Sequence, residues 1–401
     1  MAAQEYQAPE SVGRLQQRAY IVGGVALLVS VLGAMRTPEL FYQSYLMSFL
    51  FILGLTVGSL GLLMLQHLTS GHWGIIIRRP LESATRALPL MAVAFLPIAI
   101  FGMKHLYSGR GDEKGWLNAP PTGEGALSGF QKSYLTQNGF YIRAVIYFAV
   151  WLLLMFIFNI LSKQQDVNRE DRAVRLRFKM LAGPGIILYV FVMTFASIDW
   201  VMSLSPHWAS TIYGFLFVAG QLISSMSLMI AVVVLLARTE PFASVLQKRH
   251  LHDLGKLLLA FVMLWAYFDF SQLLIIWSGN QPEEISFYRT RLYGGWGVVA
   301  VIVLVFHFFI PFFLLLSQDV KRNAKVLPKI AMWLIFMRLV DLFWMTRPEF
   351  TSRALPTWLD IVLPIALGGL WLGFFAFNLK QCPLLPLGDP KLAEAIEHHE
   401  H

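Results

Sequence analysis

About ten long apolar stretches, each long enough to cross a lipid bilayer as a helix, dominate this chain. A spanning helix needs about 20 predominantly apolar residues, whereas a membrane β-barrel shows shorter segments of alternating hydrophobicity. Only 14% of the residues are charged, against about 25% in a soluble domain. The sequence therefore predicts an all-α integral membrane protein. Its expected transmembrane helices lie near residues 19–35, 44–68, 87–106, 141–162, 185–204, 209–237, 254–278, 292–317, 327–346 and 357–379.

Lysine and arginine concentrate on alternate loops. They follow the second, fourth, sixth and eighth spans, as Arg78, Arg79 and Arg86, then Lys163, Arg169, Arg172, Arg175, Arg177 and Lys179, then Arg238, Lys248, Arg249 and Lys256, and finally Lys321, Arg322, Lys325 and Lys329. Because cytoplasmic loops carry the excess of positive charge, we expect both termini to be cytoplasmic and these basic residues to be mainly topological. The net charge of +8 then does not indicate binding to nucleic acid.

The two ends of the chain carry no processing or metal-binding signal. Residues 1–18 are polar and lack the short apolar core and cleavage site of a signal peptide. The single cysteine, Cys382, excludes an internal disulfide, and no C-x-x-C-H haem attachment or iron–sulfur spacing occurs. We expect His398, His399 and His401 to be solvated.

The spans divide into four expected regions. Residues 1–41 form an N-terminal tail and the first helix, and residues 42–208 a first four-helix bundle with a long outer loop at 107–139. Residues 209–350 form a second four-helix bundle, and 351–401 the last helix and a cytoplasmic tail. The cytoplasmic segment 164–179 is expected to form an interfacial helix.

A weak internal repeat supports this division. The sequence FYIR, ending at Arg143, opens the fourth span, and FYR, followed by Arg291, opens the eighth. Asp199 lies late in the fifth span and Asp341 late in the ninth. Repeats in membrane proteins often place a polar site in each unit, although chance matching in an aromatic-rich chain remains an alternative.

Three apolar stretches contain an acidic residue, namely Asp199, Asp269 and Asp341, and the last follows Arg338 by one helical turn. Each ionisable side chain at mid-bilayer costs roughly 2.5–3.5 kcal/mol on the insertion scale. The three acids each lie late in a helix that runs outward, so we expect them to cluster in the outer half of the membrane. Such groups favour proton, ion or redox-linked work.

Polar neighbours extend this set. In the seventh span, Asp269 and Gln272 share one face, as do Tyr267 and Ser271, which predicts a polar stripe. The structural alternative is ordinary hydrogen bonding between helices, worth ~0.6 kcal/mol per contact. Arg338 and Asp341 can pair along one face, either as a switchable pair or as a purely structural one.

Three histidines are further candidates for a proton path. His307 lies four residues before Pro311, which removes the N–H that would bond the His307 carbonyl. It is a candidate proton carrier, with satisfied packing as the alternative. His67 and His105 lie at opposite ends of their helices, where interfacial residues are the default interpretation. Only His307 lies at mid-depth, so a haem bound by two histidines is not expected.

Two segments carry a resemblance to a known family: ASIDWVMSLSPHW, residues 196–208, and WAYFDFSQLLIIWSGNQPEE, residues 265–284. The chain resembles, over essentially its whole length, the ten-helix membrane subunits of bacterial alternative complex III, a quinol:electron-acceptor oxidoreductase of the wider NrfD-like, polysulfide-reductase superfamily. Of the two such subunits in that complex, it looks more like the second.

The resemblance implies two four-helix bundles with flanking helices in the bacterial inner membrane, and no haem or iron–sulfur centre of its own. It implies partners: a sister ten-helix quinol-binding subunit, a periplasmic iron–sulfur subunit, c-type cytochrome subunits and a terminal oxidase. Quinone or menaquinone is the implied small molecule, and proton half-channels are the implied role of the second subunit. Asp199, Asp269 and Asp341 lie within the matching segments or their equivalents. No residue is expected to be catalytic in this chain alone.

Two other function classes remain open at this point. A stand-alone proton-coupled secondary transporter would suit the repeat, but no substrate-sized set of unpaired polar groups is evident. A purely structural scaffold is the third reading. Copurification with cytochromes distinguishes the first class from the second.

Overall fold

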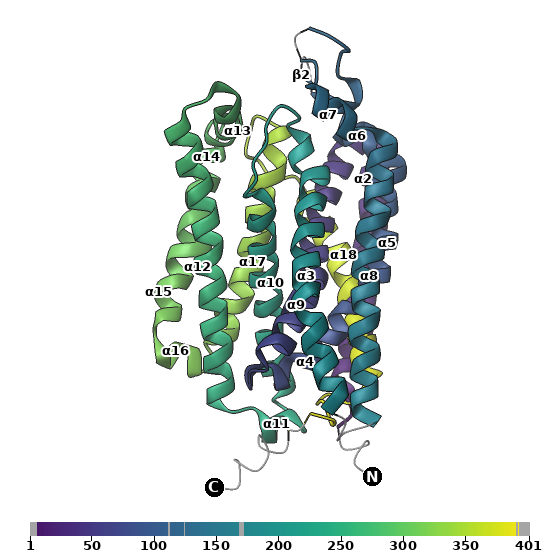
Figure 1. Cartoon of the computed structure of the whole chain (residues 1–401), viewed down its shortest axis with the longest axis vertical. Helices are drawn as coiled ribbons and strands as arrows, with labels where there is room; N and C mark the ends of the chain where they lie inside the picture. The colour runs from purple at the N-terminus through teal and green to yellow at the C-terminus, as the bar shows by residue number, and fades with distance from the viewer. Residues whose placement is uncertain (1–5, 111–112, 124, 168–171, 390–391, 393–401) are drawn as a thin grey trace.

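The computed structural model describes residues 6–110, 113–123, 125–167, 172–389 and 392. Within them the chain is helical apart from a two-residue antiparallel pair, β1 (Gly109–Arg110) and β2 (Glu113–Lys114). The long helices lie roughly parallel in one elongated bundle (Figure 1). They are α2 (Glu10–Arg36), α3 (Pro38–Thr69), α4 (Trp73–Thr85), α5 (Leu88–Pro97), α8 (Gln137–Val167), α9 (Arg172–Trp200), α10 (Tyr213–Leu236), α12 (Lys248–Gly279), α14 (Trp296–Val303), α15 (Ile310–Leu316), α17 (Leu327–Thr346) and α18 (Leu359–Lys380).

Short elements connect them. They are η1 (Ile98–Gly102), α6 (Met103–Leu106), η2 (Trp116–Asn118), α7 (Gly129–Tyr134), η3 (Met202–Leu204), α11 (Phe242–Val245), α13 (Pro282–Leu292), η4 (Leu304–Phe309), α16 (Gln318–Arg322) and η5 (Arg347–Glu349). Two of them, η1 and η4, are π-helical turns. Each adjoins a proline, Pro97 or Pro311, which removes a backbone donor and favours such a turn.

Nine helical segments of the described chain are long and apolar enough to cross a membrane. The protein is therefore a multi-pass helical membrane protein. The predicted ninth span corresponds to α17, which has the expected bounds, Leu327–Thr346. It is not among the nine, and it carries Lys329, Arg338 and Asp341.

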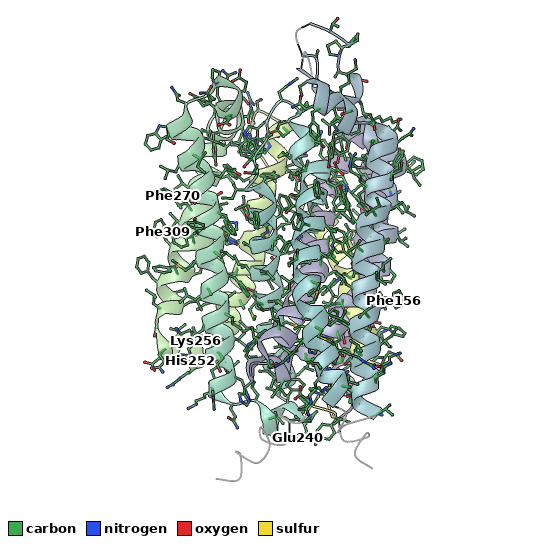
Figure 2. All side chains as sticks on the ribbon, viewed as in Figure 1. Phe156, Glu240, His252, Lys256, Phe270 and Phe309 are labelled. Carbon is green, nitrogen blue, oxygen red and sulfur yellow. The ribbon has the colours of Figure 1, made fainter. Side chains whose placement is uncertain are left out.

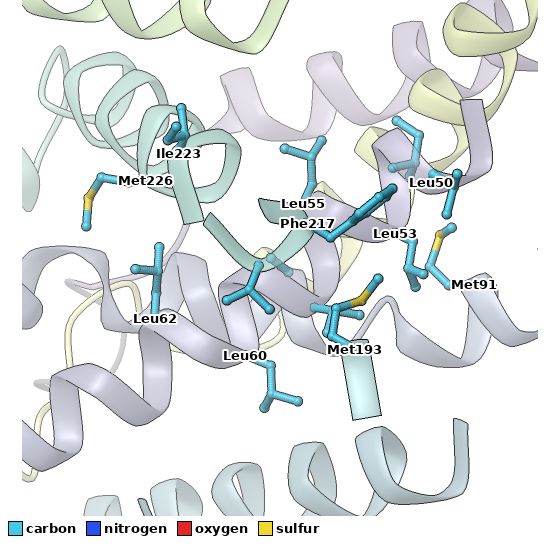
Figure 3. Packing of buried hydrophobic residues seen from close by; sticks show 14 of the residues in the cluster. Leu50, Leu53, Leu55, Leu60, Leu62, Met91, Met193, Phe217, Ile223 and Met226 are labelled. Atoms are coloured by element: carbon cyan, nitrogen blue, oxygen red, sulfur yellow. The ribbon is translucent and has the colours of Figure 1, made fainter. Parts of the chain in front are cut away.

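Helix α3 forms the centre of the bundle, with 94% of its apolar window buried. It packs against α4, α9, α10 and α18. Figure 3 shows its leucines meeting methionines and aromatic side chains of α5, α9 and α10. Gly58 of α3 lies against the carbonyl oxygen of Gln221 on α10, where a Cβ atom would overlap the backbone. Such small residues let membrane helices approach closely.

The outer surface of the bundle is apolar. Phe156, Phe270 and Phe309 point away from the bundle along its sides (Figure 2). Helix α2 packs along α18 at the edge, with Gly23 against Gly369. A surface of this kind is typical of helices in contact with lipid or with other membrane subunits.

One end of the bundle carries α11 and α16, and the other carries α7, β2 and α13 (Figure 1). His252 and Lys256 lie towards the α11 end (Figure 2). The backbone N–H of Leu384, after α18, donates to the carbonyl of Tyr6, so both ends of the described chain are adjacent.

Two expected boundaries are wrong. The third span begins at Trp73, not near 87, because α4 precedes it and every residue of α4 is buried. The segment 164–179 does not form a separate interfacial helix in its described part: residues 164–167 end α8, and residues 172–179 begin α9. His398, His399 and His401 lie outside the described residues.

Candidate functional site

Arg338 and Asp341 of α17 form a buried ion pair in the second half of the chain. Nη1 of Arg338 donates to Oδ2 of Asp341, and both side chains are almost completely removed from solvent. The guanidinium fills the space beside Gly220 of α10, where a Cβ atom would overlap it. The pair therefore joins α17 to α10 through a position that only glycine can occupy without displacement.

His307 is fully buried on the π-helical turn η4. Neither ring nitrogen has a hydrogen-bond partner among the described residues. Its ring meets Trp265 of α12 edge-on, with 4.5 Å between centroids and an interplanar angle of 80°. Buried polar groups are nearly always hydrogen-bonded to protein or water, so this imidazole lies where a water molecule or a transferred proton would satisfy it.

Asp269 of α12 has no ion pair or hydrogen bond to another described residue. Its carboxyl group interacts electrostatically with Asp341. One turn along, Gln272 is buried, accepts from the Ser210 hydroxyl at 3.1 Å and donates to the Tyr288 hydroxyl at 3.3 Å. The two residues thus differ in kind: Gln272 joins helices, whereas Asp269 is an acid without a fixed partner.

Tyr267 does not belong to a buried polar stripe. Its side chain is 64% exposed and lies on the same outward face as Phe270 and Leu274. No hydrogen bond joins it to Ser271 among the described residues. The expected i,i+4 relation holds in sequence, but this face of α12 is turned away from the bundle.

Asp199 forms a second, separate cluster. Arg143 of α8 donates to both carboxylate oxygens, from Nε at 2.7 Å and from Nη2 at 3.0 Å. Tyr147 donates to Oδ2 at 2.6 Å. Burial, with the charge of Asp199 adding to it, raises the pKa of Tyr134 to about 12, so this phenol stays protonated beside the cluster.

The three acids therefore do not form one set. No hydrogen bond or ion pair between described residues links Asp199 with Asp269 or Asp341. Asp199 is also the penultimate residue of α9, whereas Asp269 lies ten residues before the end of α12 at Gly279. The expected clustering applies to Asp269 and Asp341 and is wrong for Asp199.

The internal repeat has a different partner in its second copy. Arg291 of α13 pairs with Glu349 at 2.7 Å and donates to the Met345 carbonyl at 2.7 Å, not to Asp341. In both copies an arginine near the start of one helix thus meets an acid beyond the end of another. Glu349, in place of Asp341, is the counterpart of Asp199 in this contact.

His67 and His105 lie apart from the central pair. His67 of α3 is buried and stacks on Phe178, with 3.9 Å between ring centroids, and its Nε2 has no hydrogen-bond partner in the described chain. His105 is partly exposed and stacks on Tyr42. Neither contacts Arg338 or Asp341, so the sequence candidates divide among several places.

A charged network near the other end of α4 was missed. Glu82 accepts from Arg78 at 3.0 Å, from Arg79 at 2.7 Å and from Ser162 at 2.6 Å. Arg79 also pairs with Asp166. These arginines are buried structural residues rather than solvated topological charges. The signal available was Glu82 itself, which lies four residues after Arg78 and three after Arg79.

A further missed pair joins the ends of two helices. Arg347 pairs with Asp360 at 3.5 Å and donates to Gln43 at 2.7 Å, and Ser44 donates to Asp360 at 2.6 Å. Burial lowers the pKa of Arg347, and the charge of Asp360 opposes that shift. Asp360 lies in the first turn of α18, where an acidic side chain is favoured by the helix dipole.

Within the described residues, no group of three or more His, Cys, Asp or Glu side chains could hold a metal ion. The arrangement offers proton-exchanging groups: a paired acid, an unpaired acid and an unsatisfied imidazole on three neighbouring helices. No protein-family model matches this chain, and no curated protein matches it.

Proposed function

We propose that this chain is a ten-helix membrane subunit of a bacterial respiratory quinol:electron-acceptor oxidoreductase of the alternative complex III type, and that it contributes a proton-translocation path. The observation that supports the path is the central cluster formed by Arg338, Asp341, Asp269 and His307. The resemblance of residues 196–208 and 265–284 supports the complex.

The chemistry of the cluster suits proton transfer. Arg338 stabilises the ionised form of Asp341, because an adjacent cation favours the carboxylate. Asp269 has no such partner, and its interaction with Asp341 makes two negative charges unfavourable at once. One of the two carboxyl groups therefore tends to hold a proton while the other does not, and a proton passing between them encounters a small energy difference.

His307 extends the path away from the acids. The fully buried ring lies against Trp265, one and a half turns before Asp269 in α12, and carries two unsatisfied nitrogens. A neutral imidazole can accept a proton at one nitrogen and release one from the other. Water between His307 and the acids would complete the connection, since the site is polar enough to hold it.

The role of the chain in electron transfer is indirect on this proposal. The redox centres belong to an iron–sulfur subunit and c-type cytochromes, and a sister ten-helix subunit binds quinol. This chain offers them an apolar lateral surface and the loop between α6 and α8, with a quinone-interacting surface as a further contribution. Both termini are placed in the cytoplasm.

Gentle extraction tests the proposal. Membranes are solubilised in a mild detergent, the tagged chain is isolated, and visible spectra and mass spectrometry identify what accompanies it. We expect c-type cytochrome bands and an iron–sulfur protein in fixed stoichiometry. A chain that runs as a free monomer under conditions that preserve respiratory complexes would contradict the proposal and favour a stand-alone transporter.

A further inference from the structure

A pocket of about 470 Å³ opens between α3, α4, α8 and α9, away from the central cluster. Its lining includes the charged side chains of Arg78, Arg175 and Lys179, and the polar side chains of Gln66, His67 and Gln165. Three apolar residues, Ile75, Leu176 and Phe178, complete one side. A cavity of this size can hold a polar headgroup rather than a single water molecule.

Two buried polar atoms in this pocket lack a partner within the described chain. They are Oε1 of Gln66 and Nε2 of His67, and each side chain is more than nine-tenths buried. The structure holds both in place: His67 is stacked on Phe178, and Gln66 packs over Gly74, where a Cβ atom would overlap it. Unsatisfied buried groups of this kind are rare and here face a cavity, which points to a ligand.

The charge around the pocket is positive. Arg78 is already engaged with Glu82 and Asp389. Arg175 and Lys179 are exposed on α9 and no ion pair to a described residue is found for them. Because they lie four residues apart, they share one face of the helix. The ligand should therefore be anionic and should be contacted by two mobile cations at the rim.

The surface beside the pocket is apolar. Leu176, which lines it, is 58% exposed, and Met180, one turn further along α9, is 57% exposed. The same outward face continues through Ile187, Phe191 and Phe195. A stripe of exposed apolar side chains that starts at an anion-binding pocket fits a molecule with a charged head and hydrocarbon chains.

We infer that this pocket binds the phosphate headgroup of an anionic glycerophospholipid, with its acyl chains along α9. Basic pockets between transmembrane helices are the usual place for such headgroups. Arg175 and Lys179 neutralise the phosphate, while His67 Nε2 and the Gln66 side chain hydrogen-bond the headgroup oxygens. The inference concerns a separate site and does not depend on the proposed function.

The test uses the full-length chain in nanodiscs of phosphatidylcholine that contain a minor fraction of phosphatidylglycerol. Native mass spectrometry then measures which lipid remains bound after release. We expect phosphatidylglycerol to be retained in preference to phosphatidylcholine. The double variant Arg175→Gln/Lys179→Gln should weaken that retention about 25-fold, because each cation contributes about fivefold at such a surface.

The matched control is Arg322→Gln/Lys325→Gln, which removes the same two charges from exposed positions outside the pocket. It should change retention less than twofold. His67→Phe keeps the aromatic stack and removes Nε2, and it should reduce the preference for phosphatidylglycerol without unfolding the chain. Equal retention of both lipids by the wild type, or equal loss in the control variant, would overturn the inference. Binding of millimolar inorganic phosphate with no retained lipid would overturn it as well.

Discussion

Gly220 of α10 and Arg338 of α17 occupy one contact: the guanidinium lies where a side chain on residue 220 would be. The same guanidinium pairs with Asp341. Because an arginine in the membrane is retained only where it is paired and faces the protein interior, the missing side chain at position 220 is a condition for the buried ion pair. The polar centre and the packing of α10 on α17 are therefore one feature.

The first prediction follows from this contact. Gly220→Ala should displace Arg338 and lower the stability of the chain by about 1–3 kcal/mol, the usual cost of overpacking a well-filled interior. Melting temperature in detergent measures it. Gly24→Ala is the control, since nothing lies within 4 Å of a Cβ atom at that position, and it should not destabilise.

The two kinds of acid should respond differently to the same change. Asp199→Asn removes the charge that two donors of Arg143 and the Tyr147 hydroxyl meet, and should cost about 1–3 kcal/mol. Asp269→Asn disrupts no printed pair and should leave stability nearly unchanged. Thermal melting and expression yield of both variants check this; the reverse order would show that Asp269, rather than Asp199, is the structural acid.

Glu82 should be essential for folding, although it lies far from the candidate proton path. Glu82→Gln leaves Arg78 and Arg79 without their shared carboxylate in a buried place, and loss of one partner of such a pair costs about 3–5 kcal/mol. We expect little folded protein by size-exclusion chromatography. Glu240→Gln alters an exposed acid and should behave like the wild type.

Topology is testable by fusion. The basic residues of the α9, α12 and α16 loops predict that the end of the bundle with α11 and α16 is cytoplasmic. A reporter fused after His401 should be active only in its cytoplasmic form, and one inserted at residues 121–123 only in its exported form. The opposite pattern would invert the direction of the proposed path.

Apolar length alone was sufficient to predict the helices. Each expected span coincides with a helix or with a run of helical segments, and α17 has the expected bounds. The error at α4 has a clear physical cause. Arg78, Arg79 and Glu82 appear in sequence as loop charges, yet they neutralise one another inside the bundle, and pairing over three or four residues cannot be distinguished from solvation without the neighbouring helix.

The candidate site was less predictable for a similar reason. Arg338 and Asp341 are three residues apart, so a local rule is enough to pair them. The partner of Asp199 is 56 residues away, on another helix, and the outward orientation of Tyr267 depends on which face of α12 the bundle covers. Those relations depend on the packing of separate helices, to which periodicity within one segment gives no access.

The central claim is that Asp269 and Asp341 carry protons, and proton release per electron measures this directly. The intact complex containing Asp269→Asn or Asp341→Asn is placed in proteoliposomes, and proton release is recorded during quinol oxidation. Asparagine keeps the size and hydrogen bonding of the side chain but removes the titratable proton. We predict a lower proton yield per electron in both variants, with assembly of the Asp269→Asn complex intact. Normal turnover with a normal proton yield in both would contradict the account and leave these acids with a structural role.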